Sequence, residues 1–269
     1  MIEIIRPATL SDPRVALFDF DGTLSTIRSG WTDVMIPWMV DVLLQLKTGE
    51  TPEQLTTIVR DFVSRLTGRQ TIYQMIQLAE EVRKRGGRPQ DPLDYKRTYL
   101  QLLSQRIAGR IQFLREGGDP DHFLVPGARR LLEALTERGL RLYLASGTDH
   151  PYVLEEARLL HVAHFFGNRI FGAIDEYTRF SKAILIQQIL QSECCGEQLL
   201  SFGDGYVEIE NVKAAGGVAV GVATDEPECR CVDEWKRQRL IAAGADYIIP
   251  NYLAVEELLA HLRLPAPVE

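Results

Sequence analysis

The sequence predicts an α/β fold in which a parallel β-sheet carries helices on both faces and is interrupted by an all-helical segment. Short apolar runs of strand type alternate with helical patterns in residues 1–26 and 124–269, as in repeated βαβ units. Residues 27–123 show helical patterning and almost no strand signal. We therefore expect a core domain formed by 1–26 and 124–269 and an inserted helical cap formed by 27–123.

The composition fits a protein with a sizeable buried core. The chain has 269 residues, of which 45% are apolar, enough for a core domain and a smaller second domain. Its formal net charge of −7 argues against a general nucleic-acid binder, which would usually be basic. The sequence has neither a basic-then-apolar signal pattern nor a bilayer-length apolar stretch. We therefore expect a cytoplasmic protein without a membrane or nucleic-acid partner.

The first buried strand is predicted at Val15–Phe20, an apolar run that ends in two acids. A period of two places Asp19 and Asp21 on one side of the strand end and Phe20 on the other. Gly22 then allows a sharp turn. A hairpin with an Asp-Gly turn is the alternative interpretation. However, adjacent carboxylates repel each other, so the acid pair favours a functional role.

Four helices are predicted in the cap. Apolar residues at helical spacing mark the first helix, and Thr51-Pro52 is a good start for the second because proline suits the first helical position. Glycine pairs end the third and fourth helices. The expected helices cover residues 31–46, a segment beginning at 52, 70–84 and 91–116.

Strands and helices alternate again after residue 124. The expected strands are 140–145, 169–173, 199–202, 218–222 and 247–249, with a further edge strand at 2–5. The expected helices are 128–138, one beginning near 151, 181–192, 207–215 and 255–262. The strand 140–145 leads into Ser146-Gly147-Thr148-Asp149, which we interpret as a loop before a helix.

The segment 224–239 is an insertion between the last two strands, and its role is left open. It contains Cys229, Cys231 and Trp235, which are consistent with a surface helix that packs its tryptophan on the core or, as a weaker alternative, with a Cys-x-Cys metal site. The cysteines of the chain fit neither a disulfide framework nor the usual CxxC zinc spacing, so reduced thiols are expected.

Polar residues follow three of the predicted strands. Asp19 and Asp21 follow one strand, Ser146-Gly147 another and Asp204 a third. Ligands of open α/β sheets bind at the carboxyl ends of the strands. If these strands are neighbours in the sheet, the three groups converge on one site.

The motifs resemble those of the haloacid dehalogenase superfamily. Asp19-Phe-Asp-Gly-Thr23, Ser146-Gly147, Lys182 and Gly203-Asp204-Gly-Tyr-Val-Glu208 look like its four motifs, in the family's order. The helical insert between the first two motifs is similar to the C1 type of cap, as in the phosphoglycolate phosphatase-like and beta-phosphoglucomutase-like branch. The resemblance implies a Rossmann-like core with an inserted cap.

The resemblance also implies a role for each motif residue. Asp19 would be the nucleophile that forms an aspartyl-phosphate. Asp21 would protonate the leaving oxygen and then activate water. The Ser146 hydroxyl and the Gly147 N–H would hold phosphate oxygens, and Lys182 would bind the transferring group.

A Mg²⁺ cofactor is expected at the same site. The acids Asp19, Asp21, Asp204 and Glu208 crowd one site with only Lys182 opposing them, and uncompensated charges in a partly dry site are costly. Mg²⁺ suits an all-oxygen ligand set. The resemblance implies that Asp19, the backbone carbonyl of Asp21 and Asp204 are its ligands, with Glu208 orienting metal-bound water from the second shell.

Each motif also has an alternative interpretation on its own. Ser146–Asp149 is consistent with a helix cap, with Thr148 or Asp149 as the N-cap residue. Lys182 is consistent with a solvated lysine, Asp204 with a plain turn and Glu208 with an ordinary first-turn acid. Their occurrence together favours the site.

We therefore predict a Mg²⁺-dependent phosphatase that hydrolyses a small phosphorylated metabolite under a closing cap. Asp21 argues against dehalogenation, since the family's dehalogenases lack that second acid, and no cap lysine stands out for cleavage of a phosphonate. A phosphosugar mutase is the alternative, and a non-catalytic phosphate- or metabolite-binding module is a second one. Arg28, Trp31 and Asp33 lie where the cap leaves the core and either face the substrate or support the loop. The sequence points to no particular metabolite or oligomeric state.

Overall fold

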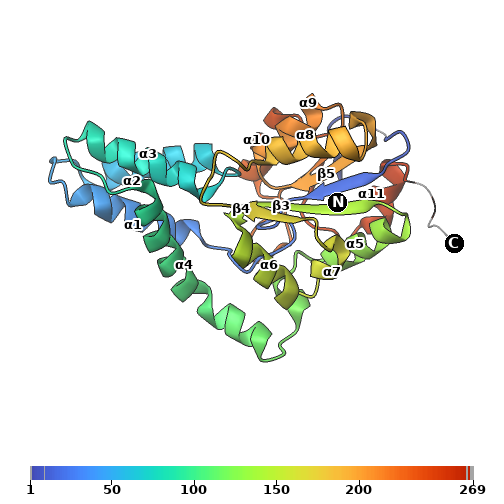
Figure 1. Ribbon diagram of the computed structural model, residues 1–269, viewed down its shortest axis with the longest axis horizontal. Helices are drawn as coiled ribbons and strands as arrows, with labels where there is room; N and C mark the ends of the chain where they lie inside the picture. Colours follow the sequence, from blue (N-terminus) through green and yellow to red (C-terminus); the bar gives the residue numbers. More distant parts are fainter. Residues whose placement is uncertain (1, 9, 265, 267–269) are drawn as a thin grey trace.

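A single seven-stranded sheet forms the centre of the molecule in a computed structural model that describes residues 2–8, 10–264 and 266. The strand order is β1-β7-β6-β5-β2-β3-β4, and every neighbouring pair is parallel except β1 with β7. The predicted fold class is therefore confirmed (Figure 1). The strands are β1 (Glu3–Ile4), β2 (Val15–Phe18), β3 (Arg141–Asp149), β4 (Ile170–Ala173), β5 (Leu199–Gly203), β6 (Val218–Val222) and β7 (Tyr247–Ile249).

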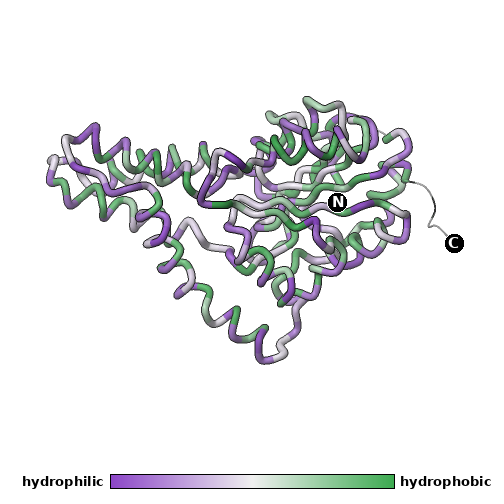
Figure 2. Tube along the Cα trace, in the orientation of Figure 1, coloured by the Kyte–Doolittle hydropathy of each residue, from purple (hydrophilic) through white to green (hydrophobic). Residues whose placement is uncertain are grey.

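Helices cover both faces of the sheet because alternate residues of its strands point to opposite sides. In β2, Val15 and Leu17 join one buried apolar cluster, whereas Ala16 and Phe18 join the other. The first cluster includes apolar residues of α8 (Lys182–Ser192), α9 (Tyr206–Ala214) and α10 (Glu234–Ala243). The second includes residues of α5 (Ala128–Glu137), α6 (His150–Leu159), α7 (Ala163–Phe166) and α11 (Val255–His261). Figure 2 shows the strands as largely hydrophobic segments between these layers.

The cap consists of four helices that extend away from the sheet (Figure 1). They are α1 (Thr32–Leu44), α2 (Pro52–Leu66), α3 (Thr71–Lys84) and α4 (Pro92–Arg115). Thr51 caps α2 by accepting from Gln54 N at 3.3 Å, and Asp91 caps α4. The chain leaves and re-enters the core side by side, since Ser25 pairs with Leu124. The helix bounds agree with the predicted ones to within a few residues, while the domain limits 1–26, 27–123 and 124–269 stay predictions.

Two local expectations need correction. β3 continues to Asp149, with a register irregularity after Ala145, so Ser146–Asp149 is an irregular strand end rather than a loop. The segment 224–239 does include the start of a helix, α10, but Trp235 is 48% exposed and stacks against Arg239 instead of packing on the core.

None of the described helices has the length and apolar character needed to cross a membrane.

Candidate active site

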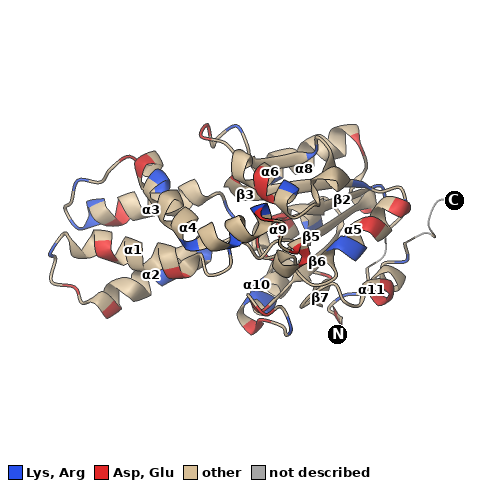
Figure 3. Ribbon diagram, turned by 90° about the horizontal axis from the view of Figure 1, so that it is seen from below, with Lys and Arg blue, Asp and Glu red and all other residues tan. Residues whose placement is uncertain are grey.

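Three polar groups meet at one edge of the sheet because β2 lies between β5 and β3. Asp19 follows β2, Asp204 follows β5, and Ser146 lies near the end of β3. The convergence expected from the sequence is therefore confirmed. A cavity of about 100 Å³ opens between this edge and the cap, and every predicted site residue except Glu208 lines it. Figure 3 shows charged residues of both signs gathered in this region.

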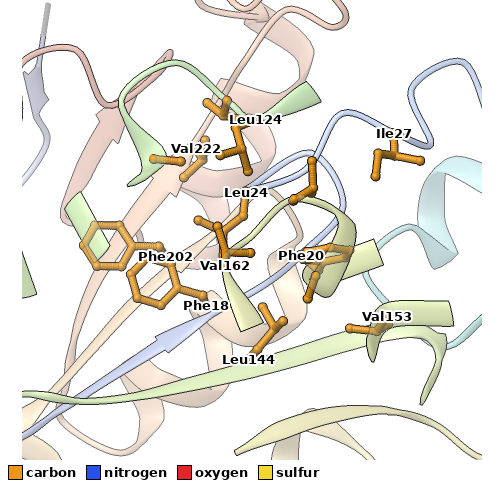
Figure 4. Packing of buried hydrophobic residues seen from close by; sticks show 14 of the residues in the cluster. Phe18, Phe20, Leu24, Ile27, Leu124, Leu144, Val153, Val162, Phe202 and Val222 are labelled. Atoms are coloured by element: carbon orange, nitrogen blue, oxygen red, sulfur yellow. The ribbon is translucent and has the colours of Figure 1, made fainter. Parts of the chain in front are cut away.

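The nucleophile candidate Asp19 is fixed from two sides. Its Oδ1 accepts a hydrogen bond from Phe20 N at 2.8 Å, and its Oδ2 lies 2.9 Å from Lys182 Nζ. Phe20 points the opposite way, into the apolar cluster with Leu24 (Figure 4). Burial raises the pKa of Asp19, and the charge of Lys182 acts against this shift.

Lys182 is enclosed by two carboxylates. Its Nζ lies 2.8 Å from Oε2 of Glu208 in addition to its contact with Asp19, and its side chain is only 5% exposed. Burial alone would lower the pKa of Lys182, but the two carboxylates raise it above its ordinary value. The interpretation of Lys182 as a solvated surface lysine is therefore wrong.

Lys182 and Glu208 are held in place because each lies at the start of a helix. α8 begins at Lys182, directly after Ser181, whose Oγ accepts from Ile184 N at 3.1 Å. In the first turn of α9, Oε1 of Glu208 accepts from Gly205 N at 2.8 Å. Both oxygens of Glu208 thus have protein partners, so this side chain orients Lys182 and the loop after β5.

Asp204 is positioned by the first motif. Its backbone N–H donates to Thr23 Oγ1 at 3.0 Å. Gly22 has a φ of +72°, and a Cβ at this position would lie 2.3 Å from Oδ2 of Asp204. Glycine is required here both for the turn and for the close approach of the carboxylate.

The acidic residues fit a divalent metal ion. Asp19, Asp204 and Glu208 each offer an oxygen within 4.8 Å of those of the other two. Oxygen ligands suit a hard cation such as Mg²⁺. All three carboxylates also have protein partners, since Asp19 and Glu208 contact Lys182 and Asp204 contacts Lys236, so a metal ion here would share its ligand oxygens with these lysines.

Asp21, the candidate acid and base, also lines the cavity. Its Oδ2 accepts hydrogen bonds from Thr148 at 2.8 Å and from Ser146 at 3.3 Å. Its Oδ1 lies 3.9 Å from Arg28 Nε. Burial raises the pKa of Asp21, although Arg28 and Thr148 oppose the shift. A carboxyl group with a raised pKa that faces a cavity is suited to donate a proton.

A family model for haloacid dehalogenase-like hydrolases matches residues 13–216, which is most of the chain. The protein belongs to the haloacid dehalogenase-like hydrolases. No curated protein sequence matches it.

Solved structures of other haloacid dehalogenase-like proteins share this fold. A putative beta-phosphoglucomutase from Thermotoga maritima is 19% identical with a TM-score of 0.53, over 91% of this chain and 99% of that one. A predicted phosphoglycolate phosphatase from Haemophilus somnus is 13% identical with a TM-score of 0.55, over 92% and 98%. A phosphonoacetaldehyde hydrolase-like protein from Oleispira antarctica is 15% identical with a TM-score of 0.58, over 97% and 98%. At these identities the likeness concerns the fold alone.

Two charged residues near this haloacid dehalogenase-like site, Lys236 and Glu226, were not predicted from the sequence. Lys236, on α10, lies 3.0 Å from Oδ2 of Asp204 and 2.6 Å from Oε1 of Glu226. The expectation that only Lys182 opposes the acids is therefore wrong, since Lys236 and Arg28 also face them. The available signal was that the segment with Glu226 follows the carboxyl end of β6, at the same edge of the sheet.

Through glycines, the cap approaches the edge of the sheet that carries the candidate site residues. A Cβ on Gly147 would lie 2.7 Å from the carbonyl oxygen of Arg69, in the turn between α2 and α3. A Cβ on Gly68 would lie 3.2 Å from Cα of Gly205. The backbone of this cap turn therefore covers two of the motif loops directly.

The remaining candidates of the sequence analysis have other surroundings. Arg28 and Trp31 line the cavity, whereas Asp33 is exposed and does not. Asp149 occupies the N-cap position of α6 without a capping bond, and it pairs with Lys96 at 2.7 Å instead. Among the residues described, Cys229 and Cys231 belong to no cluster of metal-ligating side chains.

Proposed function

We propose that this haloacid dehalogenase-like hydrolase is a Mg²⁺-dependent phosphatase of a small phosphomonoester. The observation that carries the proposal is the buried pair of Asp19 and Lys182, 2.9 Å apart, beside the second acid Asp21 in one small cavity. A nucleophilic carboxylate, a fixed cation and a proton donor are the groups that phosphoryl transfer through an aspartyl-phosphate requires.

In the first step, an oxygen of Asp19 attacks phosphorus, and the bond between phosphorus and the leaving oxygen breaks. The proton of Asp21 moves to the leaving oxygen, which departs as an alcohol. Lys182 neutralises part of the charge on the phosphoryl oxygens. The N–H of Gly147 and the hydroxyl of Ser146 hold the phosphoryl group in line.

In the second step, water attacks the phosphorus of the aspartyl-phosphate. Asp21, now ionised, accepts the proton of this water, and Asp19 is released together with inorganic phosphate. The proton count is restored, so no other co-reactant is needed. A Mg²⁺ ion held by Asp19 and Asp204 would supply further positive charge to the phosphoryl oxygens throughout.

The lysines of the cap favour ester hydrolysis over the imine chemistry of phosphonate cleavage. The cap range has three lysines, all of them described in the structure, and none lines the cavity: Lys47, Lys84 and Lys96. Lys96 is the most buried of them, but it is paired with Asp149 and Asp175. Asp21 is a proton donor beside the nucleophile Asp19. Such a donor suits ester hydrolysis, because an alkoxide leaving group needs a proton.

The proposal is tested by phosphate release from a panel of monoesters with Mg²⁺, with EDTA and in the variants Asp19→Asn and Lys182→Met. We expect release with Mg²⁺ and a loss of at least about a thousandfold in both variants and in EDTA. Asp33→Asn is the matched control, because this exposed carboxylate lies outside the cavity. Absence of release from every ester by folded, Mg²⁺-loaded protein would contradict the proposal.

A further inference from the structure

Lys236 and Glu226 are largely buried charged residues that the proposed phosphoryl-transfer steps do not use. Lys236 Nζ lies 3.0 Å from Oδ2 of Asp204 and 2.6 Å from Oε1 of Glu226. The side chains of Lys236 and Asp204 are each 14% exposed, and that of Glu226 is 18% exposed. Asp204 lines the cavity, whereas Lys236 and Glu226 do not. Any effect of these two residues on the site therefore passes through Asp204 and not through a contact with the substrate.

The carboxylates of Asp204 and Glu226 meet at the turn that contains Gly22. A Cβ on Gly22 would lie 2.3 Å from Oδ2 of Asp204 and 2.9 Å from Oε1 of Glu226. Two carboxylates that approach one point in this way repel each other unless a cation lies between them. The ammonium group of Lys236 is that cation, because it contacts the same two oxygens.

The position of Lys236 in its helix is favoured by these acids and not by the helix itself. Asp233 caps α10 by accepting from Lys236 N at 2.9 Å, so Lys236 lies in the first turn. A cation in the first turn interacts unfavourably with the helix dipole. Lys182 has the same arrangement, since it is the first residue of α8 and lies between Asp19 and Glu208.

The remaining cation near the acids, Arg28, has other partners. It pairs with Glu156 at 2.7 Å, and its Nε lies 3.9 Å from Asp21. Among the described residues, Lys236 is the one cation within 4.0 Å of the Asp204 carboxylate. Removal of its ammonium group therefore changes the charge at Asp204 directly.

A metal ion bound at Asp204 would lie close to this ammonium group. Mg²⁺ held by Asp19 and Asp204 would bring two positive charges to a carboxylate whose Oδ2 already has a cation at 3.0 Å. Like charges at such distances repel each other, and solvent screens the repulsion only in part where the groups are largely buried. Glu226 counters this repulsion, because its contact with Lys236 is the shorter of the two.

We propose that Lys236 and Mg²⁺ compete for Asp204, and that Glu226 favours the metal ion by holding the ammonium group when Mg²⁺ binds. Lys236 and Glu226 are therefore positioning residues that set the metal affinity of the site. Before the metal ion enters, Lys236 supplies the counter-charge for Asp204. The inference rests on the use of Mg²⁺ in the proposed function.

The test is a calorimetric titration of the intact protein with MgCl₂ in the absence of any ester. Lys236→Met should bind Mg²⁺ at least about tenfold more tightly than the wild-type protein, because no ammonium group competes for Asp204. Glu226→Gln should bind Mg²⁺ about tenfold more weakly, because Lys236 then has Asp204 as its only carboxylate partner. General damage to the site would weaken binding in both variants, so the opposite signs identify competition.

Two variants of α10 are the controls. Lys236→Arg keeps the positive charge and should gain no affinity. Arg237→Met removes a cation that pairs with Glu3 and Glu234 at the surface, and its affinity should stay within about twofold of the wild type. A gain in either control as large as that in Lys236→Met would contradict the inference.

Equal or weaker binding in Lys236→Met, or equal or tighter binding in Glu226→Gln, would overturn the competition. Absence of Mg²⁺ binding in both the wild-type protein and Lys236→Met would overturn it as well. The titration does not depend on turnover. A protein that shows the two opposite shifts but hydrolyses no ester would therefore contradict the proposed phosphatase and support the competition.

Discussion

Replacement of Lys236 by methionine tests whether the charges around Asp204 are balanced by this residue. The substitution keeps most of the side-chain volume and removes the ammonium group. Asp204 then loses a cation at 3.0 Å, and Glu226 loses one at 2.6 Å. Two neighbouring carboxylates would remain, in a place where burial already raises the pKa of Glu226.

The expected effect on stability follows from the burial of these groups. Removing one partner of a buried ion pair costs about 3–5 kcal/mol. The side chains of Lys236 and Asp204 are each 14% exposed and that of Glu226 is 18% exposed, so solvent screens part of the interaction. We take the lower limit, about 3 kcal/mol, which corresponds to a melting temperature lowered by roughly 6–12 °C in EDTA.

The same measurement in Mg²⁺ separates charge balance from general damage. Mg²⁺ held by Asp204 would replace part of the lost positive charge, so the deficit of Lys236→Met should shrink to about half. Arg237→Met is the matched control on the same helix, because Arg237 pairs with Glu3 and Glu234 at the surface. We expect a small loss in this variant that Mg²⁺ does not change. A deficit in Lys236→Met that is absent in EDTA, or equal with and without Mg²⁺, would refute the reasoning.

Two further predictions concern the cap turn and the pair of Arg28 and Glu156. Gly68→Ala should destabilise the protein and lower its activity more than Gly49→Ala: both glycines have positive φ, at +93° and +88°, but only a Cβ on Gly68 meets the core, 3.2 Å from Gly205 Cα. Thermal melting and phosphate release of the two variants check this, and equal effects would contradict it. Burial raises the pKa of Glu156 from its ordinary 4.5 to about 7, so between these values the folded protein binds more protons than the unfolded chain. The free energy of unfolding should therefore fall as pH rises through this window, by at most about 3 kcal/mol, and urea unfolding of Glu156→Gln should lack this slope.

Much of the site was predictable because it depends on strand order and local motifs. Apolar runs and glycines give the strands and turns, and the polar residues that follow three strands meet once those strands are neighbours. The four motifs in order supplied the candidate residues before any contact was known. The predicted strand end after Ala145 was wrong because extended backbone continues through Ser146 while its pairing with β4 becomes irregular.

The rest depends on contacts between distant parts of the chain, which carry no local pattern. Arg28 and Glu156 are separated by 128 residues, and neither residue's surroundings in the sequence predict a buried pair. Lys236 lies in a helix whose pattern resembles an ordinary solvated one, and only the course of the chain after β6 brings it to Asp204. Gln74 and Tyr99 lie on separate cap helices and resemble core or surface residues until the cavity between them is known.

Helix α10 joins the cap to the loop that carries Asp204. Lys236 contacts Asp204, while Arg239, one turn later, donates to the carbonyl oxygen of Ser64 at the end of α2 and stacks over Tyr206. A displacement of the cap would therefore shift the same helix that neutralises Asp204. The comparison of stability in EDTA and in Mg²⁺ separates the two effects of Lys236→Met, because only the lost charge at Asp204 is offset by added Mg²⁺.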